Sequence, residues 1–168
     1  EIDDDLRHLV SLISDTGMRL SEATGLMKSD INLDCDYPHL VITPYPHRSL
    51  KTLASERIVP LIGQSLWAAR RIIESTESVY CFPRYTSSLR CNANSASAAI
   101  NKWIKIVAGP DAVIHGLRHS FRDRLRAVEA PSEVIDQLGG WSLKTVGQGY
   151  GDGYKVEILS KWLEKIVI

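Results

Sequence analysis

One stretch of this chain, from His39 to Leu61, departs from the helical spacing of apolar residues that holds on both sides of it. Its two β-branched runs, HLVITPY and RIVPL, are separated by the polar, turn-like segment PHRSLKTLASE. Short runs of this kind, bounded by turn residues, are typical of antiparallel strands. The sequence therefore predicts an α+β fold that is mainly α-helical, with a small antiparallel β-sheet, a hairpin or three strands, near residues 39–61.

The flanking segments predict helices. Residues 3–16 open with three aspartates, which suit the positive N-terminal end of a helix, and their apolar residues recur on one face until Gly17 ends the pattern. Ser21 is a candidate N-cap for a short helix that ends before Asp30. Further helices are expected after Gly63, at 95–107, at 117–128 and from Pro131 to the Gly139-Gly140 pair.

The C-terminal segment repeats apolar residues at helical spacing, at Val156, Leu159, Leu163 and Ile166. An amphipathic helix of this kind either closes the core of its own chain or docks on a neighbour. The sequence alone leaves both arrangements open.

The composition is that of one ordinary domain. The chain has 168 residues, 44% hydrophobic and 24% charged, which excludes intrinsic disorder as its global state. No apolar run approaches the roughly 18 residues of a membrane helix, and the acidic start lacks the pattern of a secretory signal, so we expect a cytosolic protein. Cys35, Cys81 and Cys91 are an odd number at spacings that match no zinc pattern, which predicts neither a disulfide framework nor a structural zinc.

The formal net charge of zero is a cancellation between segments. Residues 1–36 hold 3 basic and 9 acidic side chains, residues 37–128 hold 13 and 5, and residues 129–168 hold 4 and 6. The basic middle segment is where contacts with phosphate groups are expected to concentrate. Neutrality therefore does not exclude a nucleic-acid partner, although it predicts weak binding by this chain alone.

Polar residues stand at four places where helix and turn rules do not demand them. Arg19 lies in the connection that leads to Ser21, where a guanidinium could face an anion together with a helix N-terminus. Lys51 lies in the turn-like segment between the strands. Tyr150 lies in a glycine-flanked loop, and a phenol held in such a loop can serve as a nucleophile. Taken singly, each has a plainer interpretation as a solvated side chain.

The fourth place is the segment HGLRHSFRDRLR. It brings His115, Arg118 and Arg122 about one helical turn apart, and His119 lies on the adjacent strip. His115 and His119 also have the i, i+4 spacing of zinc-binding helices, but Gly116 stands where such a motif has its glutamate base. A cationic Arg118 between the ligands also disfavours a divalent cation. A basic solvated face is the other alternative.

Taken together, the order of these elements resembles the catalytic domain of the tyrosine recombinase (phage integrase) family over nearly the whole chain. TGMRLSEATGL resembles the family's first arginine box, with Arg19 as its arginine and Glu22 as the acidic residue that follows. SLKTLASERIVPL resembles the hairpin that carries the family's lysine, here Lys51. The resemblance implies one catalytic domain over residues 1–168, without the N-terminal DNA-clasping domain that members usually carry.

Two further boxes belong to the resemblance. The family's His-x-x-Arg box appears as HGLR, with His115 and Arg118. LGGWSLKTVGQGY resembles the ending in which a histidine or tryptophan precedes the nucleophilic tyrosine, which assigns Trp141 to the first position and Tyr150 to the second. Most members have histidine where this chain has Trp141, and Tyr154 offers a second phenol.

The resemblance implies that Tyr150 cleaves a DNA strand, leaving a 3′-phosphotyrosyl link and a 5′-hydroxyl, and that a partner strand's 5′-hydroxyl then attacks the link. Arg19 and Arg118 would clamp the phosphate. His115 would take the tyrosine proton, and Lys51 would protonate the leaving 5′-oxygen.

In the same scheme Trp141 donates its indole N–H to the phosphate but shuttles no proton, and Glu22 supports the arginines. No metal, ATP or other cofactor is expected. The implied partners are double-stranded DNA and other protomers, in a tetramer on DNA with the helix at 155–168 as a possible exchange element. The implied location is the cytoplasm, at the nucleoid, of a protein encoded by a bacterium or phage.

Three alternatives remain at this stage. A type IB topoisomerase-like enzyme uses the same residue set to relax DNA without exchanging partners. A catalytically silent DNA-binding module could keep the fold, although the retained set of polar residues argues against it. A metal-dependent nuclease would need an acidic cluster, which the sequence does not supply.

Overall fold

The computed structural model describes residues 3–75, 77–141 and 153–167. The first half of the chain forms α1 (Asp5–Thr16), α2 (Leu20–Thr24), the 3-10 helix η1 (Lys28–Asp30), β1 (Ile31–Asn32), β2 (His39–Ile42), the 3-10 helix η2 (Leu53–Ser55) and β3 (Arg57–Pro60). It is followed by α3 (Gly63–Ser75), α4 (Ala93–Ala108), α5 (Ile114–Ala127), α6 (Ser132–Gly139) and α7 (Val156–Glu164). The predicted α+β class with a small antiparallel sheet is confirmed.

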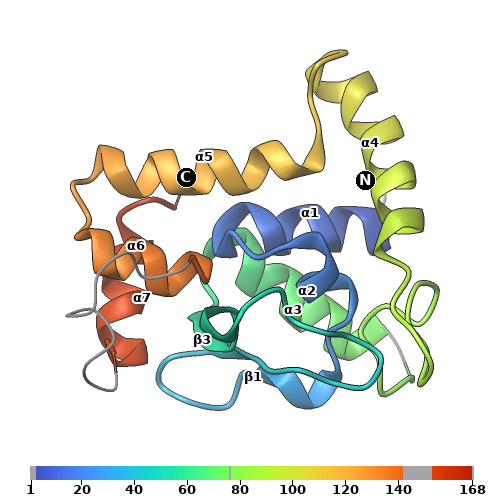
Figure 1. Cartoon of the computed structure of the whole chain (residues 1–168), viewed down its shortest axis with the longest axis horizontal. Helices are drawn as coiled ribbons and strands as arrows, with labels where there is room; N and C mark the ends of the chain where they lie inside the picture. The colour runs from blue at the N-terminus through green and yellow to red at the C-terminus, as the bar shows by residue number, and fades with distance from the viewer. Residues whose placement is uncertain (1–2, 76, 142–152, 168) are drawn as a thin grey trace.

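α1 lies between α3 on one side and α5 on the other, and it contacts both (Figure 1). Its N-terminus is capped by Asp4, whose carboxylate accepts hydrogen bonds from the backbone N–H groups of Leu6 and Arg7. Gly17 ends it in the left-handed conformation, at φ 61°, as predicted. A Cβ atom on Gly17 would lie 2.2 Å from the Phe121 ring, so this glycine also permits the close approach of α5.

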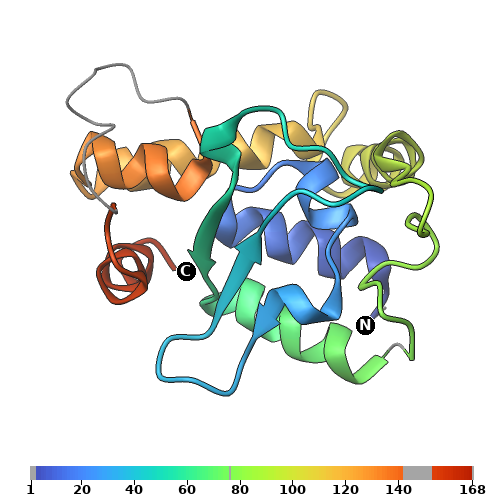
Figure 2. The same ribbon diagram turned by 60° about the horizontal axis from the view of Figure 1, so that its bottom comes forward.

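The sheet is three-stranded and antiparallel, in the order β1-β2-β3. Leu40 of β2 pairs with Val59 of β3 and with Ile31 of β1, and all three side chains are buried. Figure 2 shows β3 on the side of the sheet that faces α7, and β3 contacts both α6 and α7. The two longer strands coincide with the predicted β-branched runs, whereas β1 comes from a segment for which no strand was predicted.

Two local predictions are corrected. Ser21 does not cap α2, because the N-cap position is Arg19 and Ser21 lies inside the helix. The helix ends at Thr24, before Asp30 as predicted, and the separate turn η1 follows it. The Glu22 carboxylate explains the shift, since it accepts the backbone N–H of Arg19 at 2.8 Å and so supplies the cap from within the helix. α5 starts at Ile114, earlier than predicted.

The buried apolar side chains form two clusters. The larger one joins α1, α2, the sheet, α3, α4 and the start of α5, whereas the smaller one joins the rest of α5, α6 and α7. The smaller cluster consists of Ile62, Phe121, Leu125, Ala130, Val134, Ile135, Leu138, Leu159, Leu163 and Ile166. The active-site candidates lie where the elements of the two clusters meet.

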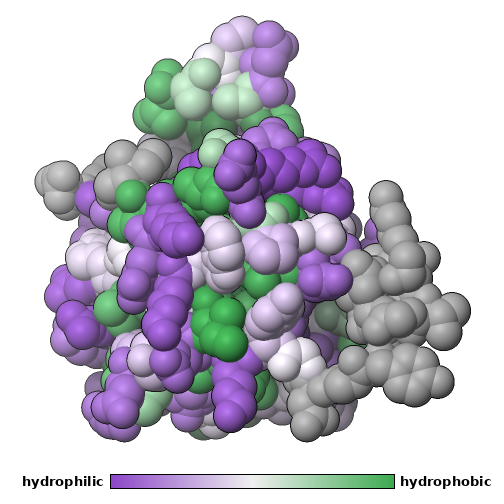
Figure 3. Space-filling view, turned by 90° about the vertical axis from the view of Figure 1, so that its left-hand side faces the viewer, coloured by the Kyte–Doolittle hydropathy of each residue, from purple (hydrophilic) through white to green (hydrophobic). Residues whose placement is uncertain are grey.

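α7 closes the core of its own chain in this structure. Leu159 and Leu163 are fully buried, and Ile166 is nearly so. The outer side carries an ion pair between Glu157 and Lys161. At the end of the molecule where α6 and α7 lie, hydrophilic residues predominate and hydrophobic ones form small separate spots (Figure 3). Of the two arrangements that the sequence left open, the structure has the intramolecular one.

Within the described ranges, none of the helices combines the length and the apolar character needed to cross a bilayer. The three cysteines are free thiols: Cys81 is buried, Cys91 is partly buried and Cys35 is exposed. Burial raises the pKa of the Cys81 thiol to about 12.

Candidate active site

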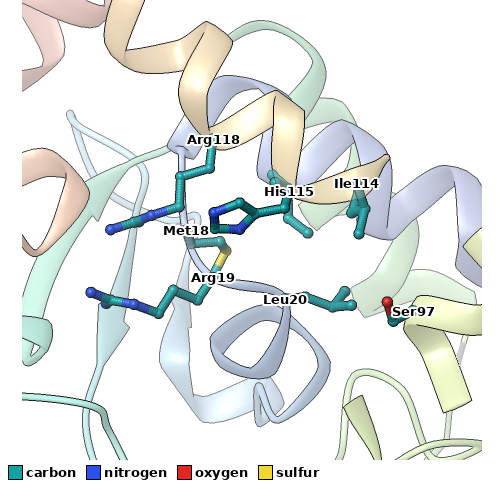
Figure 4. A pocket seen from close by; sticks show the side chains of 8 residues that line it. Met18, Arg19, Leu20, Ser97, Ile114, His115 and Arg118 are labelled. Carbon is teal, nitrogen blue, oxygen red and sulfur yellow. The ribbon is translucent and has the colours of Figure 1, made fainter. Parts of the chain in front are cut away.

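A pocket of about 170 Å³ opens where α5 meets the connection between α1 and α2. Its charged and polar lining includes Arg19, His115 and Arg118, which the sequence had singled out from two distant segments. Figure 4 shows the two guanidinium groups extending in the same direction, away from the His115 imidazole. The remaining lining residues are Ile13, Met18, Leu20, Ser97 and Ile114.

Arg19 is held by three separate parts of the chain. Its Nη1 donates to Glu22 Oε1 at 2.8 Å and to Ser55 Oγ at 3.0 Å, and its Nη2 donates to the Gly140 carbonyl at 3.2 Å. Only 20% of its side chain is exposed. The guanidinium therefore has a defined position before any substrate binds.

Glu22 lies beneath Arg19 and is buried. Its second partner is Arg57, which contacts both carboxylate oxygens, at 3.2 Å and 3.0 Å. Burial opposes ionisation of this carboxyl, but Arg57 and the donors of Arg19 outweigh burial and hold the pKa of Glu22 below its usual value. Glu22 is therefore ionised at neutral pH, as its predicted supporting role requires.

Arg57 was not among the residues singled out from the sequence. It lies on β3 in phase with Val59, and both are buried. A charged residue in phase with the inward-facing apolar residues of a strand is the signal that could have identified it. We refer to Arg19, Glu22, Arg57 and Arg118 as the arginine cluster.

Arg118 comes from the second turn of α5 and is 5% exposed. Its Nη1 donates to the carbonyl of Gly17, at the end of α1. Its Nη2 is buried and has no hydrogen-bond partner in the part of the chain that the structure describes. Burial, Arg19 and Arg57 lower the pKa of Arg118 to about 9, which still leaves it protonated at neutral pH.

His115 lies in the first turn of α5 and is exposed. Its ring meets that of His119 edge to face, at 4.8 Å between centroids. Burial, then the charges of His119 and Arg118, lower the pKa of His115 below its ordinary value. The imidazole is thus neutral at pH 7 and able to accept a proton.

Trp141 follows the left-handed Gly140 that ends α6. Its ring covers two guanidinium groups, with Arg118 at 4.3 Å and Arg122 at 4.8 Å from the ring centroid. A Cβ atom on Gly139 would lie 1.7 Å from the indole, so only glycine allows the ring to pack there. The structure therefore brings Trp141 to Arg118 and Arg122.

Lys51 is exposed on the connection between β2 and β3 and does not line the pocket. Its charge still contributes to the lowered pKa of His115. The base of the connection is fixed on α2 and the residues that follow it, because Arg48 donates to the Glu22 carbonyl at 2.9 Å and His47 bonds the Gly25 carbonyl at 3.0 Å. Lys51 thus projects from an anchored loop.

The predicted nucleophile, Tyr150, lies outside the described residues. Tyr154 is described, and its hydroxyl lies 3.4 Å from the Glu133 carboxylate. Its backbone N–H and carbonyl are both held by the Gln137 side chain, at 2.8 Å and 2.9 Å. Tyr154 is therefore tied to α6 and is not among the residues that line the pocket.

No group of three or more histidine, cysteine, aspartate or glutamate side chains gathers as a metal site among the described residues. His115 and His119 contact each other on α5, at the spacing that raised the zinc alternative, but no carboxylate or thiol joins them there.

The family model described as "Phage integrase family" matches residues 2–155. Tyrosine recombinase XerC of Mycobacterium bovis (strain BCG / Pasteur 1173P2) and that of Mycobacterium tuberculosis (strain ATCC 25177 / H37Ra) are each 30% identical over 156 residues. These alignments cover 86% of this chain and 48% of each relative. The chain thus spans about half the length of the curated relatives it matches.

Solved structures with a similar fold include the Tn1549 transposon integrase in complex with circular intermediate DNA. It has a TM-score of 0.59 at 16% identity, covering 92% of this chain and 55% of that one. The XerH site-specific recombinase bound to difH substrate has a TM-score of 0.57 at 19% identity, covering 96% and 44%. At these identities the likeness concerns the fold, and it confirms the fold that the sequence resemblance implied.

Proposed function

This chain belongs to the phage integrase family, and we propose that it is the catalytic domain of a site-specific DNA recombinase. It cleaves and rejoins DNA strands through a 3′-phosphotyrosyl intermediate. The observation that carries the proposal is the convergence of Arg19, His115 and Arg118 on one pocket, where Arg118 keeps a buried N–H donor without a partner among the described residues.

The charge of the pocket supports a phosphate ligand. The arginine cluster has three guanidinium groups and one carboxylate, so like charges are held close together in a buried place. The lowered pKa of Arg118 reflects this repulsion, after burial itself. A bound phosphodiester relieves it, and the relief grows as negative charge accumulates on the phosphate in the transition state.

The proposed strand-cleavage step uses Tyr150 as the nucleophile, His115 as the base and Lys51 as the acid. The Tyr150 oxygen attacks the scissile phosphorus, and its proton passes to the neutral His115. As the O–P bond forms, the bond from phosphorus to the 5′-oxygen breaks, and Lys51 delivers a proton to that oxygen. Arg19 and Arg118 stabilise the nonbridging oxygens throughout. Rejoining is the reverse sequence with a 5′-hydroxyl from a partner strand.

Trp141 and Glu22 support this chemistry without transferring protons. Trp141 covers Arg118 and offers an indole N–H to a phosphate oxygen, and Glu22 holds Arg19. The phosphotyrosyl link conserves the energy of the diester, so the reaction requires no ATP. The guanidinium groups supply the positive charge that a metal supplies in other phosphoryl-transfer enzymes, and the reaction is expected to proceed in EDTA.

The partners in this proposal are double-stranded DNA and further copies of the protein. The names of the relatives, recombinases and a transposon integrase, favour strand exchange over the relaxation of a topoisomerase-like enzyme and over a silent module. Recombination requires a tetramer on DNA. In that assembly the segment 155–168, whose helix α7 here packs on its own chain, is the candidate exchange element. The protein would act on DNA in the cytoplasm, at the nucleoid.

Covalent trapping tests the proposal. Nicked duplexes tiled across the DNA that flanks the protein's own gene are incubated with the protein in EDTA, and adducts that resist SDS are resolved on a gel. The wild type should form an adduct, Tyr150→Phe should form none while still binding DNA, and the matched control Tyr154→Phe should behave as the wild type. An adduct with Tyr150→Phe would refute the assignment of the nucleophile.

A second assay separates strand exchange from relaxation. Plasmids that carry two copies of the trapped sequence are incubated with the protein, and both recombinant product and change of supercoiling are measured. Recombinant product supports the proposal. Relaxation without recombinant product would favour the topoisomerase-like alternative.

A further inference from the structure

Arg57 makes an unusually complete set of contacts for a residue outside the predicted site. Its Nε donates to the Leu138 carbonyl at 2.9 Å, and its Nη1 donates to the Ser55 carbonyl at 2.7 Å. Its Nη1 and Nη2 also contact the two Glu22 oxygens. The residue is 8% exposed. One buried guanidinium thus joins α2, the end of η2 and the end of α6.

Each of these three segments adjoins a residue of the proposed site. Arg19 is the N-cap of α2, Lys51 lies in the loop that leads into η2, and Trp141 follows the end of α6. The contacts of Arg57 therefore link parts of the chain that must keep a common geometry for a phosphate to be bound and cleaved.

Glu22 transmits the position of Arg57 to Arg19. Its Oε1 accepts from Arg19 Nη1 and Arg57 Nη1, and its Oε2 accepts from the Arg19 backbone N–H and Arg57 Nη2. Both oxygens thus accept two donors each. The Arg19 guanidinium can therefore move or rotate little as long as Arg57 holds the Glu22 carboxylate from the other side.

Gly140 fits between the two arginines. A Cβ atom on this residue would lie 2.6 Å from Arg57 Nη1, so the Arg57 guanidinium packs directly on its backbone. Its carbonyl accepts from Arg19 Nη2. The peptide immediately before Trp141 is therefore fixed by Arg57 and Arg19 together.

A simple contribution to stability does not account for this arrangement. A buried ion pair seldom stabilises a protein more than apolar residues of similar volume, because desolvation offsets the attraction between the charges. What a guanidinium adds is a fixed planar set of donors that imposes a geometry on its partners.

We propose that Arg57 is a positioning residue for DNA cleavage, which fixes the Arg19 guanidinium through Glu22 and holds the end of α6 against it. The proposal rests on the proposed function for its effect on cleavage. Its effect on Arg19 is a property of the protein without DNA. Arg57→Lys is the informative variant, because it keeps the charge but has no planar fork to reach Glu22, Ser55 and Leu138 together.

The first measurement needs neither DNA nor activity. Nitrogen-15 NMR of the arginine side chains reports the rotation of the Arg19 Nη groups, with the signal assigned by its loss in Arg19→Lys. Rotation should be slow in the wild type and at least about tenfold faster in Arg57→Lys, since the carboxylate that restrains it is released. Unchanged rotation in a folded Arg57→Lys protein would overturn the proposal.

Arg124→Lys is the matched control. Arg124 is also largely buried and joins distant segments, through Asp15, the Ser14 carbonyl and the Ile166 carbonyl, but it does not line the pocket. Its replacement should alter stability without changing the rotation of Arg19. An equal effect of both variants on Arg19 would mean that Arg57 acts only through general stability, which would also contradict the proposal.

The second measurement is single-turnover cleavage at saturating protein, on a nicked duplex that the wild type cleaves. Arg57→Lys should cleave roughly 10- to 100-fold more slowly, as expected for a misplaced catalytic group, with its Kd for DNA within about threefold of the wild type. In an Arg19→Lys background the same change should cost less than about threefold, because Arg57 acts through Arg19. If the two substitutions slowed cleavage in a fully additive way, Arg57 would not act through Arg19.

The two measurements separate the two proposals. If the wild type forms no adduct with any duplex, the proposed function fails, and the rotation of Arg19 alone still decides the role of Arg57. If Arg57→Lys does not fold, as judged by circular dichroism, Arg57→Gln takes its place with the same expected results. Arg57→Gln keeps an amide donor near the Leu138 carbonyl without burying a charge.

Discussion

The proposed site has a buried half and an exposed half, and they differ in how their groups are held. The arginine cluster is fixed by hydrogen bonds to four segments and has little contact with solvent. Lys51 and His115 are exposed, one on a loop and one in the first turn of a helix. Groups that stabilise charge are effective when they are fixed beforehand, whereas groups that move a proton need access to the reacting atoms.

Removal of the central carboxylate should have the largest effect on the buried half. Glu22→Gln leaves the Arg19 and Arg57 guanidinium groups without their shared counter-ion, so the free energy of unfolding should fall by about 3–5 kcal/mol. Urea unfolding at pH 7 measures this free energy of unfolding. The matched control is Glu157→Gln, whose ion pair with Lys161 is exposed, so its loss should leave the free energy of unfolding nearly unchanged. If both variants lowered the free energy of unfolding equally, burial of the carboxylate would not decide its contribution to stability.

The next largest effect on cleavage is expected at Arg118, whose Nη2 donor has no partner among the described residues. Arg118→Lys keeps a positive charge but cannot contact the Gly17 carbonyl and a phosphate with one planar group, so cleavage should fall roughly 10²- to 10³-fold. Single-turnover cleavage and the Kd for DNA are measured together. Arg126→Lys, on the same helix but exposed, is the control. A loss of DNA affinity that accounts for the whole effect would mean that Arg118 binds DNA without acting on the transition state.

The exposed half is tested first at Lys51. Lys51→Ala should slow cleavage of an ordinary 5′-oxygen about 10²-fold, because the leaving oxygen loses its proton donor. A 5′-bridging phosphorothioate should be cleaved at nearly the wild-type rate, since its sulfur leaves without protonation. If both substrates are slowed equally, Lys51 is not the general acid.

The smallest expected effect is the fall of the cleavage rate on the acid side of its pH profile, the acid limb. In the proposed mechanism His115 acts in its neutral form, and its pKa lies below the ordinary value, mainly through burial and then the charges of His119 and Arg118. Cleavage should therefore be insensitive to His115 protonation at pH 7 and fall about tenfold per pH unit once the pH drops below this lowered pKa. His115→Asn should be slower at neutral pH and lose this limb. An unchanged limb in that variant would assign it to another group.

Much of the fold followed from local patterns. The two β-branched runs became β2 and β3, and the periodic apolar segments became helices, because these patterns reflect which side chains can be buried on one face. The patterns missed β1 and placed the N-cap of α2 at Ser21 instead of Arg19. These elements are two and five residues long, and their limits depend on contacts made elsewhere in the chain. The Glu22 carboxylate that sets the start of α2 lies inside the helix, so a search for a capping serine missed it.

The sequence by itself determined the class of fold, the family and most of the charged residues of the candidate site, because these depend on residue types in a fixed order. Tertiary structure decided which of these residues share a pocket, that Arg118 has a donor there without a partner among the described residues, and that α7 packs on its own chain. Arg57 illustrates the physical reason for this difference between sequence and tertiary structure. Its role depends on the Leu138 carbonyl and the Glu22 carboxylate, 81 and 35 residues away, which only the folded chain brings within hydrogen-bond distance.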